Sequence, residues 1–534
     1  MRYKISLSKW NFSIEKLGYH APVSVPHTWN VDNPVMNYRG SALYETSVFI
    51  KKELQSQKAF ISFGAVYHTA KIYVNDIFAG EHCRSGFTPF QIDITQLIIY
   101  DADNHIRVAV NNEPSSEMLP HQKDFDWADD GGIIRRAELL FFEPDGISFL
   151  HAEERLRIIE NDRCSGSLIL KTGFEDGKAK EGIVRILDYS DGSLVLEKHF
   201  DCIEKEISLD FEALKLWSCY SPNLYRIALE TEHDYLEIRT GLRQIEVSGE
   251  HILLNGKDIY LKGCEWMPGS HPDFGMAEPL EHSISRLKQL KLAGCCFTRF
   301  HWQQDDTIFD WCDENGLLVQ EEIPYWGSPR QPSSSQLAIA RQQADEMVYF
   351  HSQHPSIVFW GVGNELEGED PAVIAYVEEM VSYFKSIDSR RLVNYVSNSL
   401  GKMRFAHGDD ATLHGDIAMW NEYLGLWEAS DNVESHLIRT CKKAEGMPLV
   451  ISEFGLCEPR FCGGDERRAQ ILEQRLKLYY EIANIRGHVW FSLNDYRTQF
   501  GEEGEGKMRM RIHGSTDLYG NEKPSYRLLC RLQQ

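Results

Sequence analysis

Two glutamates in the second half of the chain stand where a pair of acids can do chemistry. The apolar run 357–363 leads directly to Asn364 and Glu365, and the run 449–451 leads through one serine to Glu453. A glutamate at the tip of a buried strand is held rigidly and faces the space above the sheet. Two such carboxyls supply the acid and the nucleophile or base that glycoside hydrolysis needs. The alternative for each is a structural role at a helix start, where the helix dipole stabilises a carboxylate.

The two glutamates belong to a region with the rhythm of a (β/α)8 barrel. From about residue 246, buried strands alternate with amphipathic helices, and this fold places its chemistry at the carboxyl ends of the strands. Glu365 and Glu453 fall at the ends of the fourth and seventh predicted strands. The predicted strands are 259–263, 296–300, 317–321, 357–362, 393–396, 417–421, 448–452 and 489–492, and the predicted helices include 283–293, 306–315, 371–387 and 466–485.

The chain before the barrel has the pattern of two all-β domains. Residues 1–145 contain short alternating strands separated by Gly, Asn and Asp, which is typical of a jelly-roll sandwich. Residues 146–245 repeat this style and suit an immunoglobulin-like β-sandwich, although the Cys-Trp-Cys pattern of a true immunoglobulin domain is missing. We therefore predict a multi-domain protein: a jelly-roll domain, an immunoglobulin-like sandwich and a catalytic (β/α)8 barrel over 246–534.

Side chains at other predicted strand ends extend the candidate site. They are Arg299 and His301 after the second strand, Tyr423 after the sixth and Trp490 in the eighth. An arginine can hold a nucleophilic carboxylate ionised, a tyrosine can donate to it, a histidine can bind sugar hydroxyls, and an indole can stack on a pyranose ring. The alternatives are structural: Arg299 pairs with Glu321 or Glu322 at the third strand end, and Trp490 belongs to the barrel core.

Composition and charge disfavour several classes of partner. The 534 residues include 80 acidic and 56 basic side chains, and the net charge of −24 disfavours nucleic acid and anionic membranes. No signal peptide and no apolar run long enough to span a bilayer is visible. The 12 cysteines form no CxxC pair, and the adjacent Cys295 and Cys296 lie in an apolar stretch, which favours reduced thiols. We expect a cytoplasmic protein; an exported protein with its leader removed would look the same.

A series of segments along the whole chain resembles glycoside hydrolase family 2, the group of β-galactosidases, β-glucuronidases and β-mannosidases. The segments are 25–30, 38–45, 131–135, 254–257, 261–263, 309–319 and 354–365. The resemblance implies the same three domains, with a sugar-binding-like jelly roll. It also implies a retaining double displacement, in which one carboxyl attacks the sugar and the other transfers the proton.

The resemblance further implies roles for single residues. Glu365 matches the acid/base and Glu453 the nucleophile. The residues that match sugar-contacting or nucleophile-supporting positions are Asn364, Arg299, His301, Tyr423 and Trp490. Asp126 lies in an acidic loop that would otherwise be interpreted as solvated. It resembles the residue on a first-domain loop that reaches into the barrel mouth and holds a sugar hydroxyl.

The sequence departs from the family where the sugar is recognised. Glucuronidases carry an Asn-x-Lys pair after the eighth strand that grips the sugar carboxylate. The stretch 509–515 lacks this pair and offers Arg509, Arg511 or His513 instead. The mannosidase-like Trp-Gly-Gly run after the second-strand arginine is also missing.

The end of the first barrel strand departs from the family as well. Glu265 and Trp266 stand where many galactosidase-like members have an Asn-x-His segment, so we expect these two residues to reshape the sugar pocket. Some large relatives use Mg²⁺, but no ligand cluster in this sequence demands a metal. We therefore predict no cofactor and no metal site.

The leading hypothesis is a retaining exo-β-glycosidase that hydrolyses a terminal β-linked sugar, with a β-galactoside as the first expected substrate. A β-glucuronide comes next, and a β-mannoside, β-glucoside or α-L-arabinopyranoside follows. The remote alternative is a catalytically silent carbohydrate-binding protein that has kept the scaffold. We expect a carbohydrate substrate and neither nucleic acid nor membrane as partner, and the sequence leaves a homo-oligomer open.

Overall fold

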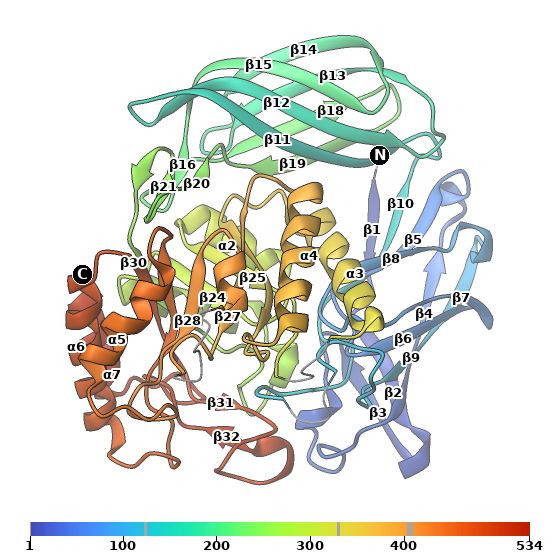
Figure 1. Ribbon diagram of the computed structural model, residues 1–534. Coiled ribbons are helices and arrows are strands. Elements are labelled where there is room, and N and C mark those ends of the chain that lie inside the picture. Colours follow the sequence, from blue (N-terminus) through green and yellow to red (C-terminus); the bar gives the residue numbers. More distant parts are fainter. Residues whose placement is uncertain (1, 122–124, 328–331, 403–408, 534) are drawn as a thin grey trace.

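Three groups of elements follow one another along the chain: two antiparallel β groups and a closed parallel barrel surrounded by helices (Figure 1). The computed structural model describes residues 2–121, 125–327, 332–402 and 409–533. The second β group lies across one end of the barrel, and the first packs against its side. The predicted fold class is confirmed.

The first β group consists of two antiparallel sheets that face each other. Their orders are β3-β2-β4-β9-β6-β7 and β1-β10-β5-β8. Burial alternates along the strands, so that β5 buries Ala59, Ile61 and Phe63 toward the space between the sheets. The strands are β1 (Tyr3–Ser6), β2 (Lys9–Ile14), β3 (Tyr19–Ser24), β4 (Ser41–Ile50), β5 (Lys58–Phe63), β6 (Thr69–Val74), β7 (Ile77–His82), β8 (Phe90–Asp93), β9 (Ala102–Asn111) and β10 (Ala137–Phe142).

The second β group is a smaller sandwich of a three-stranded sheet, β11-β12-β15, and a four-stranded sheet, β14-β13-β18-β19. Its strands are β11 (Ile147–Glu160), β12 (Arg163–Phe174), β13 (Lys180–Asp188), β14 (Leu194–Ile203), β15 (Glu206–Lys215), β18 (Tyr225–Glu230) and β19 (Tyr235–Thr240). Short strands lead from this sandwich to the barrel: β16 (Trp217–Ser218), β17 (Ser221–Pro222), β20 (Ile245–Ser248), β21 (His251–Leu254) and β22 (Lys257–Asp258).

The barrel closes in chain order from β23 to β30, with all neighbouring strands parallel. Its strands are almost entirely buried on both faces, as the helix layer of this fold requires. They are β23 (Leu261–Cys264), β24 (Phe297–Phe300), β25 (Leu318–Glu322), β26 (Ile357–Asn364), β27 (Leu392–Ser397), β28 (Ala418–Asn421), β29 (Leu449–Phe454) and β30 (Ile485–Trp490).

Helices cover the barrel, and their starts follow from the sequence. The side chain of Asp305 caps one helix, and Asp370 with Pro371 in the first turn caps another. The helices are α1 (Leu280–Leu292), α2 (Asp306–Asn315), α3 (Ser334–His351), α4 (Pro371–Ile387), α5 (Val433–Cys441), α6 (Gly464–Glu481) and α7 (Pro524–Gln533). A small hairpin of β31 (Tyr496–Arg497) and β32 (Met510–Arg511) follows the last barrel strand.

Most predicted elements differ from the observed bounds by a few residues, and the largest differences concern the eighth barrel strand and the helix before it. The sequence predicts the eighth strand at 489–492, but β30 begins at Ile485, where it already pairs with β29. The polar residues Arg486 and His488 obscure the start of this strand in the sequence pattern. The strand still forms there, because the barrel strands on both sides pair with its backbone regardless of the side chains. The helix predicted to reach residue 485 ends at Glu481, because Ile482 adopts an extended conformation.

Ion pairs attach the first β group to the barrel mouth. Arg497, after the eighth strand, holds Asp130 with two hydrogen bonds of 2.8 and 3.0 Å between fully buried side chains. Lys507 pairs with the neighbouring Asp129. Loop 125–130 is therefore fixed over the carboxyl ends of the barrel strands. All 12 cysteines are free, and no helix of the described residues has both the length and the apolar character to cross a bilayer.

Candidate active site

A cavity of about 260 Å³ lies at the carboxyl ends of the barrel strands. Both predicted catalytic residues, Glu365 and Glu453, line it. Glu365 follows β26 and has a left-handed backbone with φ of 53°, a conformation that side chains other than glycine rarely adopt. Its N–H donates to the carbonyl of Val396 at the end of β27, 2.9 Å away, which fixes this strained position.

Glu453 is held on both carboxylate oxygens. Arg299 Nη1 donates to Oε1 at 2.9 Å, and the hydroxyl of Tyr423 donates to Oε2 at 3.0 Å. Burial raises the pKa of Glu453 and the charge of Glu365 adds to the rise, while these two donors oppose it. Arg299 and Tyr423 therefore favour the ionised carboxylate that a nucleophile must present.

Arg299 also has the structural partner that the sequence offered as an alternative. Its Nε and Nη2 atoms each donate at 3.1 Å to Glu322, at the end of the neighbouring strand β25. Gln320 donates to the same carboxylate at 2.8 Å. Glu321, the other candidate partner, instead contacts His351 at 2.9 Å. Glu322 therefore orients the guanidinium whose remaining nitrogen reaches Glu453.

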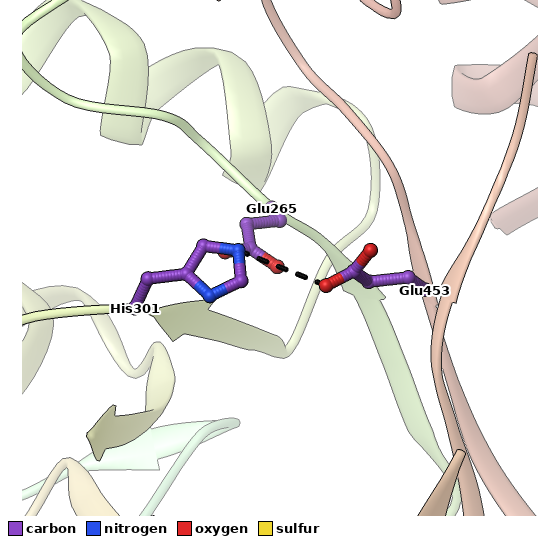
Figure 2. Close-up of side chains that lie close together, drawn as sticks. All are labelled: Glu265, His301 and Glu453. Carbon is purple, nitrogen blue, oxygen red and sulfur yellow. Dashed lines mark ion pairs between the residues drawn. The ribbon is translucent and has the colours of Figure 1, made fainter. Parts of the chain in front are cut away.

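His301 and Glu265 complete the buried cluster around Glu453. Figure 2 shows the imidazole of His301 beside the carboxyls of Glu265 and Glu453, with its Nε2 atom 3.1 Å from the former and 3.7 Å from the latter. Because Arg299 donates to Nδ1 at 3.0 Å, the hydrogen of the neutral ring sits on Nε2. Burial and the charge of Arg299 lower the pKa of His301 to about 4, which keeps the ring neutral.

Glu265, His301 and Glu453 lie close enough together to suggest a metal site. The guanidinium of Arg299 already supplies the positive charge between the two carboxyls, since its Nη1 atom lies 2.9 Å from Glu453 and 3.3 Å from Glu265. A metal ion between these carboxylates would face the guanidinium at short range, and like charges in a buried site repel strongly. The donor set therefore does not fit a metal ion in this arrangement.

Glu365 has far fewer partners than Glu453. Asn421 Nδ2 donates to its Oε1 at 2.8 Å, and Ser452 in turn donates to Asn421 Oδ1 at 2.8 Å. The same amide contacts Asn364 at 3.2 Å. Burial raises the pKa of Glu365, and the hydrogen bond from Asn421 opposes the rise only in part. A carboxyl with a raised pKa keeps its proton at higher pH, as an acid catalyst requires.

Asp126 reaches the cavity from the first β group. Thr498 donates to its Oδ1 at 2.8 Å, Tyr496 to its Oδ2 at 3.1 Å, and Arg511 pairs with Oδ2 at 2.6 Å. These three partners all come from the segment after the eighth barrel strand. The structure thus brings a residue of the amino-terminal part of the chain into the cavity that holds both glutamates.

Of the predicted substrate-binding residues, Asp126 and Tyr423 line the cavity, whereas Arg299, His301, Asn364, Trp490, Glu265 and Trp266 do not. Trp490 is fully buried beneath it, donates to Ser515 at 2.9 Å and packs edge-on against Phe454. Trp266 is 1% exposed and lines a separate cavity of about 200 Å³ between the first β group and the barrel. Glu265 is also fully buried, behind Glu453. The roles predicted for these residues stay predictions.

Several residues of the site have no role in the sequence-based prediction. Asn421 ends β28 just as Asn364 ends β26, so the recurrence of a strand-terminal Asn-Glu pair was the available signal. Glu322, the anchor of Arg299, enters that prediction only as part of the structural alternative. The other lining residues without a predicted role are Trp326, Asn398, Lys402, Trp427, Glu428, Phe491 and Tyr496. They come from the segments that follow the barrel strands, which carry no long periodic pattern.

Comparisons with known proteins agree with this architecture. Residues 245–480 match the description "Glycosyl hydrolases family 2, TIM barrel domain", and residues 5–143 match "Glycosyl hydrolases family 2, sugar binding domain". The chain belongs to glycoside hydrolase family 2. Within this family it is 27% identical to a β-glucuronidase of Bacteroides fragilis, over 84% of this chain and 67% of that protein. It is 26% identical to a β-galactosidase of Thermoanaerobacterium thermosulfurigenes, over 93% of this chain and 70% of that protein.

One solved structure matches this chain over nearly the full length of both proteins. The β-D-glucuronidase of Dictyoglomus thermophilum superposes with a TM-score of 0.87 at 21% identity, covering 100% of this chain and 97% of that one. The likeness shows a shared fold. As a family 2 member the protein is a β-glycoside hydrolase, and its relatives carry the names of enzymes for at least two different sugars.

Proposed function

We propose that this family 2 enzyme is a retaining exo-β-glycosidase, with Glu453 as nucleophile and Glu365 as acid/base. The observation that carries the proposal is the contrast between the two carboxyls in one cavity. Burial raises the pKa of both carboxyls, but Glu453 receives hydrogen bonds on both oxygens, one of them from the cationic Arg299, whereas Glu365 accepts from one neutral donor among the described residues. The first arrangement favours a carboxylate anion and the second a carboxylic acid.

The reaction then proceeds in two displacements. Ionised Glu453 attacks the anomeric carbon and forms a glycosyl ester while the glycosidic bond breaks, and Glu365 gives its proton to the departing oxygen. Glu365, now a carboxylate, takes a proton from water. The resulting hydroxide oxygen attacks the anomeric carbon, the ester bond breaks and Glu453 leaves as the carboxylate. Two inversions leave the sugar with its original β configuration.

We propose a β-galactoside as the first substrate, because the charges of the cavity favour a neutral sugar. Four carboxyl residues line it, Asp126, Glu365, Glu428 and Glu453. With Glu365 protonated as the acid, the remaining carboxylates still balance the two cations Lys402 and Arg511 and leave no excess positive charge for an acidic sugar. Arg511 is already paired with Asp126 at 2.6 Å and with Glu502 at 3.3 Å. Burial and the charge of Arg511 lower the pKa of His513 well below its usual value, so this imidazole adds no charge.

A β-hexuronoside is the second candidate, and one observation favours it. Of the residues that the sequence offered in place of the Asn-x-Lys pair, Arg511 and His513 line the cavity. A guanidinium can bind a carboxylate through two nitrogens, and Arg511 could therefore exchange part of its contact with Asp126 for a sugar carboxylate. The relatives of this chain include proteins named β-glucuronidase as well as proteins named β-galactosidase.

Hydrolysis of a panel of p-nitrophenyl β-glycosides tests the proposal. The panel contains the galactoside, glucuronide, galacturonide, glucoside and mannoside, with the α-L-arabinopyranoside added. We expect the highest kcat/KM for the galactoside, and a highest value for either uronide would replace it by the second candidate. Proton NMR of the first product should show the β anomer; an initial α anomer would contradict the retaining mechanism. No hydrolysis across the panel would contradict the assignment for simple glycosides.

A further inference from the structure

One half of the cavity surrounds the acid/base rather than the nucleophile. Glu365 follows β26, and the loops after the two neighbouring strands flank it. Trp326 follows β25 and forms a β-bridge with Asn364, and Lys402 follows β27. In a retaining displacement the acid/base faces the departing oxygen, so the loops beside it surround the leaving group. This half of the cavity is thus a place for whatever is attached to the terminal sugar.

Two charged side chains at this side of the cavity form no side-chain hydrogen bond with any of the described residues: Lys402, and Glu428, whose loop after β28 contacts Gly401 beside Lys402. Lys402 and Glu428 both line the cavity. The side chain of Glu428 is only 13% exposed, and its Oε1 atom is buried without a hydrogen bond. His436 Nε2 lies 3.7 Å from this oxygen, but it already contacts the carbonyl of Gly401 at 2.7 Å. Buried polar groups without hydrogen-bond partners are rare and require an explanation.

The backbone around these side chains is firmly held. The carbonyl of Glu428 accepts from Gly425 N–H at 2.7 Å, and its own N–H donates to Tyr423 at 3.2 Å. The loop that carries Lys402 packs closely against the side chain of Glu428. A Cβ atom added at Gly401 would lie only 2.6 Å from Glu428 Oε2. Lys402 and Glu428 therefore lie on adjoining loops that pack against each other, as expected of a preformed binding site.

The electrostatics fit a ligand with hydroxyl groups. Burial raises the pKa of Glu428 to about 7, with a further rise from Glu422, while the charge of Lys402 opposes it. Near neutral pH this carboxyl is thus available both to donate and to accept a hydrogen bond, and the ammonium of Lys402 donates. Trp326 adds half-buried aromatic surface on the other side of Glu365.

We propose that Lys402 and Glu428 form a leaving-group subsite that binds the hydroxyls of a second sugar, so that the preferred substrate is an oligosaccharide end. This inference rests on the proposed glycosidase function. An apolar leaving group would cover both polar side chains without forming hydrogen bonds to them. A covered polar group without a hydrogen bond costs far more binding free energy than a missing apolar contact. A sugar ring instead offers hydroxyls to both.

Leaving-group dependence tests the subsite. Lys402→Met and Glu428→Gln are compared with the exposed controls Lys442→Met and Glu445→Gln. One substrate is a disaccharide whose terminal sugar is the one cleaved in the aryl-glycoside panel, and the other is the 2,4-dinitrophenyl glycoside of that sugar. We expect each subsite variant to lower kcat/KM for the disaccharide about 10- to 100-fold, the worth of a hydrogen bond to a charged group.

The dinitrophenyl glycoside provides the internal reference. Its leaving group departs without help, so its kcat follows release of the sugar from Glu453 and should change little in either variant. Free sugar added as an acceptor should divert the glycosyl-enzyme into a new disaccharide in the wild type and the controls, and much less in the subsite variants. A thermal unfolding measurement on each of the four variants serves as the control that it is folded.

The outcomes separate the two proposals. Equal losses on both substrates, or no loss on either, would overturn the leaving-group subsite while leaving the glycosidase assignment intact. A wild-type protein that cleaves neither the disaccharide nor any aryl glycoside would overturn the function on which the subsite rests.

Discussion

The surroundings of Glu453 and Glu365, the proposed nucleophile and acid/base, differ in the number and charge of their partners. Glu453 lies in a buried network in which one guanidinium, Arg299, contacts three carboxyl groups: Glu265, Glu322 and Glu453 itself. Among the described residues, Glu365 accepts one side-chain hydrogen bond, from the neutral amide of Asn421, and it lines the same cavity as Trp326 and Lys402. The donors around Glu453 favour its ionised form, and the single neutral donor to Glu365 favours neither form strongly.

This difference matches the work that each group does in a double displacement. The nucleophile attacks and leaves as an anion, so a dense set of donors that stabilises the anion serves both steps. The acid/base gains and loses a proton in each cycle, and a strong charged partner would lock it in one state. Sparse bonding around Glu365 is therefore a functional property of the site, and it also leaves room for a leaving group.

Removing the nucleophile should have the largest effect. Glu453→Ala should lower kcat by roughly 10⁴-fold or more, because no other group can form the glycosyl ester. Added azide should restore turnover by entering the vacated space and should yield the α-glycosyl azide. The corresponding azide product of Glu365→Ala should be the β anomer. Identical azide products from both variants would contradict the assigned roles.

Removing the acid/base should have an effect that depends on the leaving group. Glu365→Gln should lower kcat/KM by about 10²- to 10⁴-fold for a disaccharide, the usual contribution of general acid catalysis, and far less for a dinitrophenyl glycoside. Because the raised pKa of Glu365 keeps its proton in place at higher pH, the wild-type rate should fall on the alkaline side as this proton is lost. The variant should lack this alkaline fall. An unchanged pH profile would assign the acid elsewhere.

Weakening the charged network should shift the acidic side of the same profile. Arg299→Lys loses the forked contact with Glu322 that aims the guanidinium at Glu453. Since Arg299 lowers the pKa of Glu453, its loss should raise that pKa and move the acidic fall in kcat/KM to higher pH. Thermal unfolding reports the cost to stability, about 3–5 kcal/mol if a buried carboxylate is left unpaired. A lower rate with an unmoved acidic limb would mean that Arg299 acts through packing alone.

The smallest effects should come from the two neutral donors, and their ratio sharpens the comparison. Tyr423→Phe removes a donor to an anion and should lower kcat about 10- to 100-fold. Asn421→Ala removes a neutral donor to a carboxylic acid and should lower kcat about 2- to 10-fold. Dinitrophenyl glycosides measure both in parallel. If Asn421 proved the more important of the two, the contrast between the two carboxyl environments would be wrong.

The amino-acid pattern alone predicted the order of the domains and singled out the two carboxyls that the structure brings into one cavity. Apolar runs that end in a polar residue, such as 449–451 before Glu453, mark buried parallel strands, and the parallel barrel brings their carboxyl ends to one face. For the same reason the position of Arg299 and Tyr423 at strand ends is enough to place both near Glu453. Periodicity was a weaker guide at β30, where polar residues lie in a strand.

Which side chains line the cavity follows from packing that the sequence pattern does not record. Trp490 and Trp266 end strands like the catalytic residues, yet they lie beneath or beside the cavity, because strand position fixes a Cα atom and the local packing fixes where the side chain points. The contact of Asp126 with Arg511 joins residues 385 apart in the sequence. No local pattern records such a pairing, which exists because the first β group is docked at the barrel mouth.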